Sequence, residues 1–170
     1  MLVLVAAGAL AESSPLQLSV TPDIALFDRT VTVEGLTVGL WSENPQSALA
    51  LGIVNGSSGQ SAGLSFGAVL NYAGDYKGLE LAPFNYVKGD FSGWQLGLVN
   101  YTERSMKGVQ SGVMNYAGRL TGLQIGLINY APTTRSGVQF NAASIFSENR
   151  WLTGLPDEPA PVTALINWRF

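Results

Sequence analysis

Few side chains in this sequence have the chemistry needed for catalysis. Histidine and cysteine are both absent, which removes the commonest general base, the thiol nucleophile and most zinc ligands. Ser111 has no histidine or lysine near it in a catalytic pattern, so we do not expect it to act as a nucleophile. Glycine-rich segments such as Gly35–Trp41 lack the patterns of phosphate-binding loops. We therefore expect no catalysis, no metal and no cofactor.

Carboxylates are the remaining candidates for ion chemistry. Asp157 and Glu158 lie in a proline-rich stretch and could join a cation site, but the stretch favours a solvated loop. Glu80 replaces a recurring glutamine, and we expect it to line a lumen or the surface, with Arg119 or Arg135 as a conceivable partner. Three other carboxylates fall in turn-like stretches, where aspartate commonly accepts local hydrogen bonds: Asp75, Asp90 and Glu103.

Tyrosines recur at one fixed position and are the candidate binding residues: Tyr86, Tyr101, Tyr116 and Tyr130. Trp168, near the end of the chain, joins this set. Aromatic side chains at strand ends form the interfacial girdle of membrane β-proteins. They can also stack on one another, or on bases and sugars. The fixed strand-end position favours a girdle or a packed ladder.

These residues belong to a tandem repeat. Units of the form GxQxGxxNY begin at Gly93, Gly108 and Gly122, at intervals of 15 and 14 residues. Related units begin at five further positions: Gly35, Ala48, Gly63, Gly78 and Gly137. The units cover about residues 35–146, and a repeat of this length decides the architecture before local propensity does.

Residues alternate within a unit with the period of a β-strand. Between Phe91 and Tyr101, one face carries Ser92, Trp94, Leu96, Leu98 and Asn100, and the other carries Phe91, Gly93, Gln95, Gly97, Val99 and Tyr101. Across the units the central positions of the first face are apolar except for Ser111. The central position of the second face is small or polar: Thr37, Ala50, Ser65, Glu80, Gln95, Gln110, Gln124 and Gln139.

Two all-β architectures use such a repeat. In an up-and-down antiparallel β-barrel of about ten strands, each unit is one strand and one turn, the apolar face meets lipid, and the glutamine face lines a narrow lumen. In a β-solenoid with coils of about 15 residues, equivalent positions stack in parallel and form asparagine and tyrosine ladders. Strand length and the uncharged apolar face favour the barrel, which is our prediction. The solenoid is the alternative.

Both ends of the chain suggest export. Residues 1–11 are apolar and end in Ala9-Leu10-Ala11, like the hydrophobic region and cleavage site of a signal peptide, but without preceding basic residues. No later apolar stretch reaches the roughly 20 residues of a spanning helix. Residues 162–170 alternate up to Phe170, like the closing strand of an outer-membrane barrel that the assembly machinery reads. We expect one all-β domain over residues 12–170.

The composition excludes one class of partner. Charged residues make up 12% of the chain, about half the share in an ordinary soluble domain. The net charge is −3 and no basic cluster is present, so nucleic acid is not an expected partner. The expected partners are the lipid bilayer and the outer-membrane assembly machinery, with an unidentified protein or glycan as a further possibility.

The segments GWQLGLVNY, GVQSGVMNY and GLQIGLINY, with the NWRF ending, resemble the leptospiral-type family of bacterial surface repeat proteins. Glu80, Pro83 and Asn141 depart from the repeat pattern. The resemblance implies a protein of the bacterial outer membrane or cell surface and brings no catalytic or ligand residues. We therefore expect a structural or weakly channel-forming surface protein. The alternative is a surface β-solenoid that acts as an adhesion or scaffold module.

Overall fold

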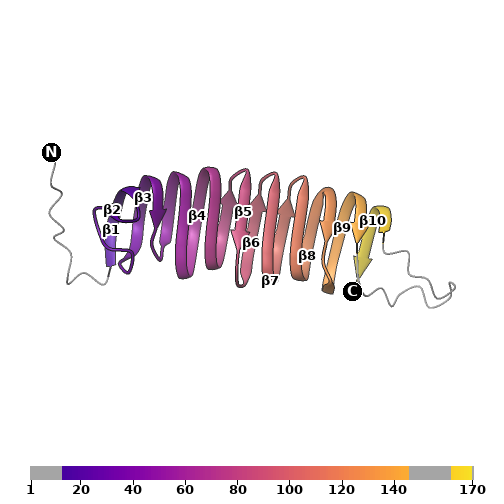
Figure 1. Ribbon diagram of the computed structural model, residues 1–170. Coiled ribbons are helices and arrows are strands. Elements are labelled where there is room, and N and C mark those ends of the chain that lie inside the picture. Colours follow the sequence, from indigo (N-terminus) through magenta and orange to yellow (C-terminus); the bar gives the residue numbers. More distant parts are fainter. Residues whose placement is uncertain (1–12, 146–161, 170) are drawn as a thin grey trace.

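The computed structural model describes residues 13–145 and 162–169, and this part of the chain is all-β. Its strands are β1 (Ser13–Thr21), β2 (Ile24–Ala25), β3 (Thr32–Glu43), β4 (Ser47–Leu81), β5 (Phe84–Val87), β6 (Phe91–Leu96), β7 (Val99–Ser111), β8 (Met114–Tyr130), β9 (Thr133–Ile145) and β10 (Val162–Arg169). Successive coils stack side by side into an elongated rod (Figure 1). Three features named above lie outside the described residues: the signal-peptide-like residues 1–11, the acidic pair Asp157 and Glu158, and Phe170.

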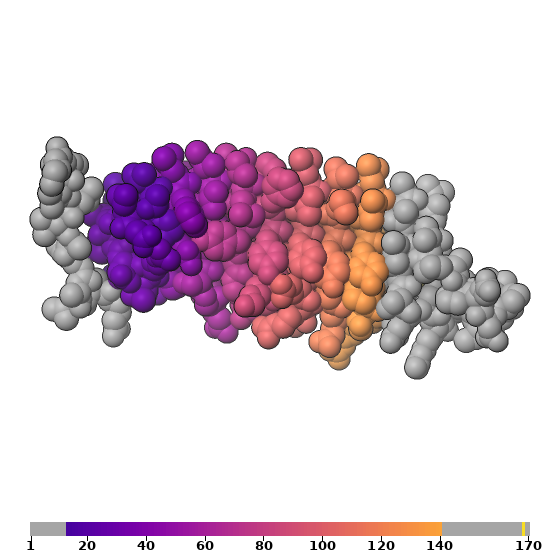
Figure 2. All heavy atoms as spheres, viewed as in Figure 1, coloured from indigo at the N-terminus to yellow at the C-terminus, as the bar shows by residue number. Residues whose placement is uncertain are grey.

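The architecture is a parallel β-solenoid, so the prediction of a barrel is wrong and the alternative is confirmed. The glycines that begin successive units pair in parallel register, Gly78 with Gly93, Gly93 with Gly108, and so on to Gly137. One repeat unit is therefore one coil. An antiparallel barrel would place alternate turns at opposite ends, and its units would have no reason to share the same turn residues. The coils form a continuous body in which each coil covers the next (Figure 2).

Each coil bends at a corner that simple alternation does not reveal. β6 ends at Leu96 and β7 begins at Val99, so Gly97 and Leu98 form a turn. The turn resets the alternation, and Asn100 is buried like Gln95 instead of lying outside with Leu98. Pro83 occupies the same corner one coil earlier, between β4 and β5. The equivalent residues Leu98, Val113 and Leu127 each donate an amide hydrogen to the preceding coil, and Pro83 lacks this donor.

Four columns of side chains fill the interior, so the lumen expected for a barrel is absent from the described coils. Two columns are largely apolar and include Tyr76, Phe91, Met106 and Leu120 in one and Ala73, Val87 and Ala117 in the other. The third is the glutamine column: Glu80, Gln95, Gln110, Gln124 and Gln139. The fourth is the asparagine column: Asn55, Asn71, Asn85, Asn100, Asn115 and Asn129. The core therefore pairs an apolar half with a half made of amides.

A column of glycines lets the coils approach one another. It consists of Gly63, Gly78, Gly93, Gly108 and Gly122, whose φ angles lie between 117° and 141°. L-residues rarely adopt these angles. A Cβ on any of them would lie 1.9–2.1 Å from a carbonyl oxygen of the preceding coil. The repeat needs glycine here for both backbone conformation and space.

The two ends of the described sheet depart from the repeat. β10 turns back and pairs antiparallel with β9, with Trp168 opposite Val138. At the other end β1 pairs parallel with β3, and the short β2 folds back antiparallel onto β1. The strand order is β10-β9-β8-β7-β5-β4-β3-β1-β2, and β6 pairs with β4 and β7.

Candidate functional site

The glutamine column is a chain of hydrogen bonds inside the rod. Each amide nitrogen donates to the side-chain oxygen of the preceding coil, from Gln139 through Gln124, Gln110 and Gln95 to Glu80, over 2.5–2.9 Å. All five side chains are at most 1% exposed. Burial of this many amides is tolerated only because they satisfy one another. The column holds the coils together and is closed to any ligand from outside.

Glu80 is the N-terminal end of this hydrogen-bonded chain. It is buried inside the rod, and not at a lumen or on the surface as expected. It is 1% exposed and accepts a hydrogen bond from Nε2 of Gln95 over 2.9 Å. Burial raises the pKa of Glu80 to about 8, although the hydrogen bond from Gln95 favours the charged form. The carboxyl group is therefore largely protonated at neutral pH. Like the glutamines that follow it, it is then an uncharged hydrogen-bonding side chain.

The asparagine column supports the corner of each coil. Asn85, Asn100 and Asn115 each donate through Nδ2 to the side chain of the next asparagine, over 2.7–2.9 Å. The same nitrogens donate to the carbonyl oxygens of Leu96, Ser111 and Ile125, which also accept backbone amide hydrogens. The asparagines thus supply a second hydrogen bond to carbonyl groups at the corner.

The four predicted tyrosines form one stacked column on the outside of the rod. Ring centroids are 5.8 Å apart for Tyr86 and Tyr101, 4.3 Å for Tyr101 and Tyr116, and 5.4 Å for Tyr116 and Tyr130. Both faces of the two middle rings are covered by their neighbours. The column therefore offers ring edges and hydroxyl groups, and not the open ring faces that stacking on bases or sugars requires.

Trp168 does not join this column. Its register partner in β9 is Val138, which belongs to the apolar face of the repeat, and Trp168 is 44% exposed. Tyr72, which was not among the predicted tyrosines, pairs in register with Tyr86 and so belongs to the same row. Its place after Asn71, in the same Asn-Tyr pair as the other tyrosines, was the available signal.

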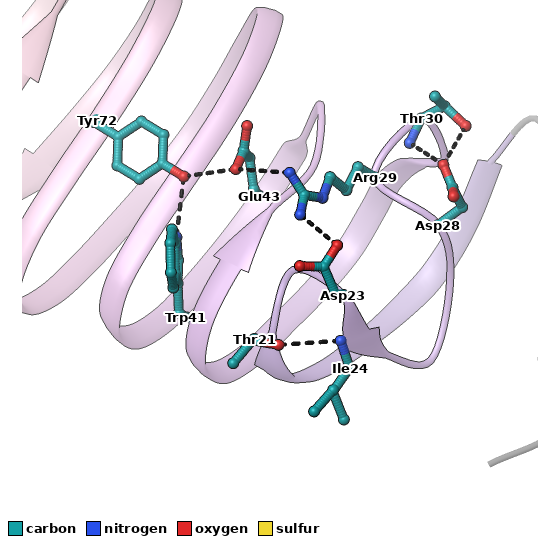
Figure 3. Close-up of polar contacts among 9 residues, drawn as sticks. All are labelled: Thr21, Asp23, Ile24, Asp28, Arg29, Thr30, Trp41, Glu43 and Tyr72. Atoms are coloured by element: carbon teal, nitrogen blue, oxygen red, sulfur yellow. Dashed lines mark hydrogen bonds and ion pairs between the residues drawn. The ribbon is translucent and has the colours of Figure 1, made fainter. Parts of the chain in front are cut away.

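Tyr72 connects its row to the N-terminal loop (Figure 3). Its hydroxyl accepts a hydrogen bond from Nε1 of Trp41 over 3.0 Å and donates to Oε2 of Glu43 over 2.9 Å. Arg29 then bridges Glu43 and Asp23. Burial raises the pKa of Tyr72 to about 12, so the hydroxyl keeps its proton and remains a donor to Glu43.

A polar groove of about 540 Å³ lies along one side of the middle coils. Its lining includes Asp75, Asp90, Lys77 and Lys107. Asp75 accepts from the amide of Asp90 over 2.7 Å and from Arg104 over 3.1 Å, and Asp90 accepts from the amide of Ser105 over 3.1 Å. These carboxylates serve the local hydrogen bonding expected of turn residues. The two aspartates of the groove are therefore engaged in structural contacts.

Apolar and charged side chains lie on opposite corners of the coils. The apolar edge, at and beside the corner of Gly97 and Leu98, comprises Leu40, Leu51, Ile53, Leu64, Val69, Leu81, Phe84, Trp94, Leu98, Val113, Met114, Ile125, Leu127, Ile128 and Phe140. These side chains are 38–58% exposed. The charged edge, at the other corner, comprises Asp75, Lys77, Lys88, Asp90, Glu103, Arg104, Lys107, Arg119 and Arg135. Six of these are basic and three acidic, a net charge of +3.

No protein-family model, curated protein or solved structure matches the chain. In residues 13–145 and 162–169, no group of three or more metal-binding side chains comes together. No helix long and apolar enough to cross a membrane occurs in the same part of the chain. The segregated surface is the feature from which a function can be argued.

Proposed function

We propose that this protein is an exported β-solenoid of the bacterial cell surface that acts as a non-catalytic adhesion or scaffold module. The observation that carries the proposal is the separation of the apolar edge from the charged edge in the coils between Asp75 and Arg135. An exposed apolar surface of this extent marks an interaction site. A rod whose interior is occupied by its own side chains interacts through its outside.

Export is supported by sequence features. The signal-peptide-like residues 1–11 and the resemblance to the leptospiral-type surface repeat family both favour the cell envelope. A scaffold role is supported by the hydrogen-bonded columns, which connect successive coils from Asn55 to Gln139 and make this part of the rod stiff. The two groove aspartates already serve turn amides and Arg104, which favours a structural role over a catalytic one.

Surface labelling tests the proposal. The chain is produced in a Gram-negative bacterium from its own start and, in parallel, with residues 1–11 replaced by an established signal peptide. Intact cells are treated with a membrane-impermeant amine reagent, and modification of Lys77, Lys88 and Lys107 is read by peptide mass spectrometry. We expect labelling in intact cells and attachment of these cells to surfaces above that of cells without the protein.

A chain without residues 1–11 or any signal peptide is the control, and its lysines should react only after lysis. A protein that remains soluble in the cytosol or periplasm from both starts, with no labelling on intact cells, would contradict the proposal.

A further inference from the structure

Building on the proposed envelope location, we infer that the apolar edge docks into one leaflet of a lipid bilayer, so that the solenoid is a monotopic membrane protein. The occupant of this surface is lipid, and the charged edge stays in the headgroup region or in water. Four features of the described coils favour lipid as the occupant. They are the absence of charge on the apolar edge, the hydrogen bonding of its backbone, its height, and the residues that border it.

The apolar edge is continuous and free of charge. Its side chains recur in coil after coil at the same corner, so those of neighbouring coils lie next to one another. Between Gly93 and Asn100, and again between Gly122 and Asn129, no charged residue occurs. Ser111, the polar exception on this face, accepts a hydrogen bond from Nε1 of Trp94 over 3.2 Å. When such a surface enters hydrocarbon, it buries mainly apolar area, and transfer of apolar area out of water is favourable.

Corner backbone groups of the apolar edge in the coils from Pro83 to Ile128 pair with neighbouring coils. The carbonyl of Leu98 accepts the amides of Val113 and Met114, both over 2.9 Å, and the carbonyl of Pro83 accepts those of Leu98 and Val99. Side chains of the asparagine column satisfy further corner carbonyls from inside. Hydrocarbon requires this internal pairing, because it holds no water to which an unpaired backbone group could bond. A protein partner would not require it, since it can supply hydrogen bonds itself.

The height of the apolar edge matches one leaflet and not a whole bilayer. From Leu123 to Leu127 the chain advances four residues, which is roughly 13 Å at the usual rise of a strand. The hydrocarbon core of a bilayer is about 30 Å thick, so one leaflet contributes about 15 Å. Insertion of the edge therefore stops at the bilayer midplane.

Residues typical of a membrane interface border the apolar edge on both sides. On one side lies the tyrosine column, where the hydroxyl of Tyr86 donates to Glu103 of the charged edge. On the other side lie Lys77 and Lys107, which precede the glycine column. Tyrosine and lysine place an apolar stem in lipid and a polar tip at the headgroups. The charge of +3 on the charged edge favours anionic lipids.

Site-specific fluorescence tests the docking on the purified chain. The protein has no cysteine, so Leu127→Cys and the matched control Thr133→Cys on the charged edge can each carry one environment-sensitive dye. Vesicles contain phosphatidylcholine with or without phosphatidylglycerol, and with nitroxide-labelled acyl chains. With vesicles, we expect the dye at position 127 to shift to shorter wavelength and to be quenched, and the dye at position 133 to do neither. Unchanged emission at position 127 would overturn the inference.

Vesicle flotation gives a second readout. Leu98 and Leu127 are 56% and 58% exposed, so the double variant Leu98→Asp/Leu127→Asp should keep its circular dichroism spectrum. It should partition about tenfold or more weakly into vesicles. The control Thr133→Asp/Ser136→Asp adds the same charge at the other corner and should float like the parent chain, with slightly reduced preference for anionic lipid.

A second copy of the chain is the alternative occupant. Dimers in solution that Leu98→Asp/Leu127→Asp dissociates, together with no flotation of the parent chain, would overturn docking to lipid. Because these measurements use purified protein, they are independent of export. Vesicle binding by a chain that stays in the cytosol would contradict only the proposed function, and a surface-labelled chain that does not bind vesicles would contradict only the lipid docking.

Discussion

Glu80 shows how the interior of the solenoid changes the chemistry of a single residue. In the sequence it is a carboxylate in a row of glutamines, with distant arginines as conceivable partners. In the fold it lies inside the rod and accepts a hydrogen bond from Gln95. Burial therefore dominates, and the pKa rises to about 8. The preceding coil has Ser65 at this position, so the uninterrupted run of long side chains that begins at Gln139 ends at Glu80.

Stability should therefore fall as the pH rises toward 8. The unfolded carboxyl group titrates near 4.5 and the folded one near 8, so between these values the folded chain holds a proton that the unfolded chain has lost. The free energy of unfolding then decreases by about 1.4 kcal/mol per pH unit in this window and levels off above it. Glu80→Gln should remove this decrease and be more stable than the parent chain at pH 8, as measured by urea unfolding from pH 4 to 9.

The exposed Glu34 provides the control for this pH series. Glu34→Gln should retain the decrease in stability between about pH 4.5 and 8 that is assigned to Glu80. Parallel pH profiles for Glu80→Gln and the parent chain would show that Glu80 does not titrate in this window.

The two amide columns are the elements that hold neighbouring coils in register. In the glutamine column each nitrogen donates toward the N-terminal end of the rod, as from Gln110 to Gln95. In the asparagine column each donates toward the C-terminal end, as from Asn100 to Asn115. The side-chain dipoles of the two columns therefore oppose each other, and the interior acquires no large net dipole along the rod. Within each column a side chain donates to one neighbouring coil and accepts from the other, so the hydrogen bonding of a coil depends on both neighbours.

Gln110→Leu should destabilise the rod although leucine fills a similar volume. The substitution removes the donor to Oε1 of Gln95 at 2.8 Å and to the carbonyl of Tyr116 at 3.0 Å, and the acceptor for Gln124 at 2.7 Å. Buried groups left without partners cost about 1–3 kcal/mol each, so we expect a loss of about 2–5 kcal/mol in chemical denaturation. The exposed Gln60 serves as control, and Gln60→Leu should change stability by less than about 0.5 kcal/mol. Equal stabilities of the two variants would disprove the role of the column.

The whole molecule behaves as a one-dimensional stack in which each coil contacts mainly the coils before and after it. Parallel register relates Gly93 to Gly78 and to Gly108, so the surface pattern repeats with each coil. The apolar edge and the charged edge are therefore properties of the stack and grow with the number of coils. In such repeat proteins, stability is approximately a sum over repeats and their interfaces.

Deletion of one full coil should therefore leave the fold intact. Removal of residues 93–107 joins Ser92 to Gly108 and restores every column one unit shorter. We expect the circular dichroism spectrum of the parent chain and cooperative thermal unfolding at a moderately lower temperature. Removal of residues 93–100 provides the contrast, because it places the glycine and amide columns out of register and should abolish folding. Loss of structure in the variant that lacks the full coil would contradict the stack.

Much of the candidate surface could be predicted from the repeat. Between Phe91 and Leu96 a period of two separates Gln95 from Trp94, and the structure buries the first and exposes the second. Glycine recurs at Gly93 and Gly108, and an added Cβ at either position would clash with a carbonyl oxygen of the preceding coil. The common position of Tyr101 and Tyr116 indicated a ladder in the solenoid alternative, and their rings stack 4.3 Å apart.

Tertiary structure decided the rest, because alternation along a strand says nothing about where the strand turns or which way its neighbour runs. The corner at Gly97 reverses the sides expected for Asn100, and this reversal places a second amide column inside the rod. Parallel pairing then puts equivalent side chains one coil apart. In this geometry glutamines hydrogen-bond to glutamines inside, and leucines gather on one edge outside. By itself the sequence determined an all-β repeat with one apolar and one polar face. Pairing between coils depends on contacts one whole repeat apart, and this pairing decided that the polar face is the core.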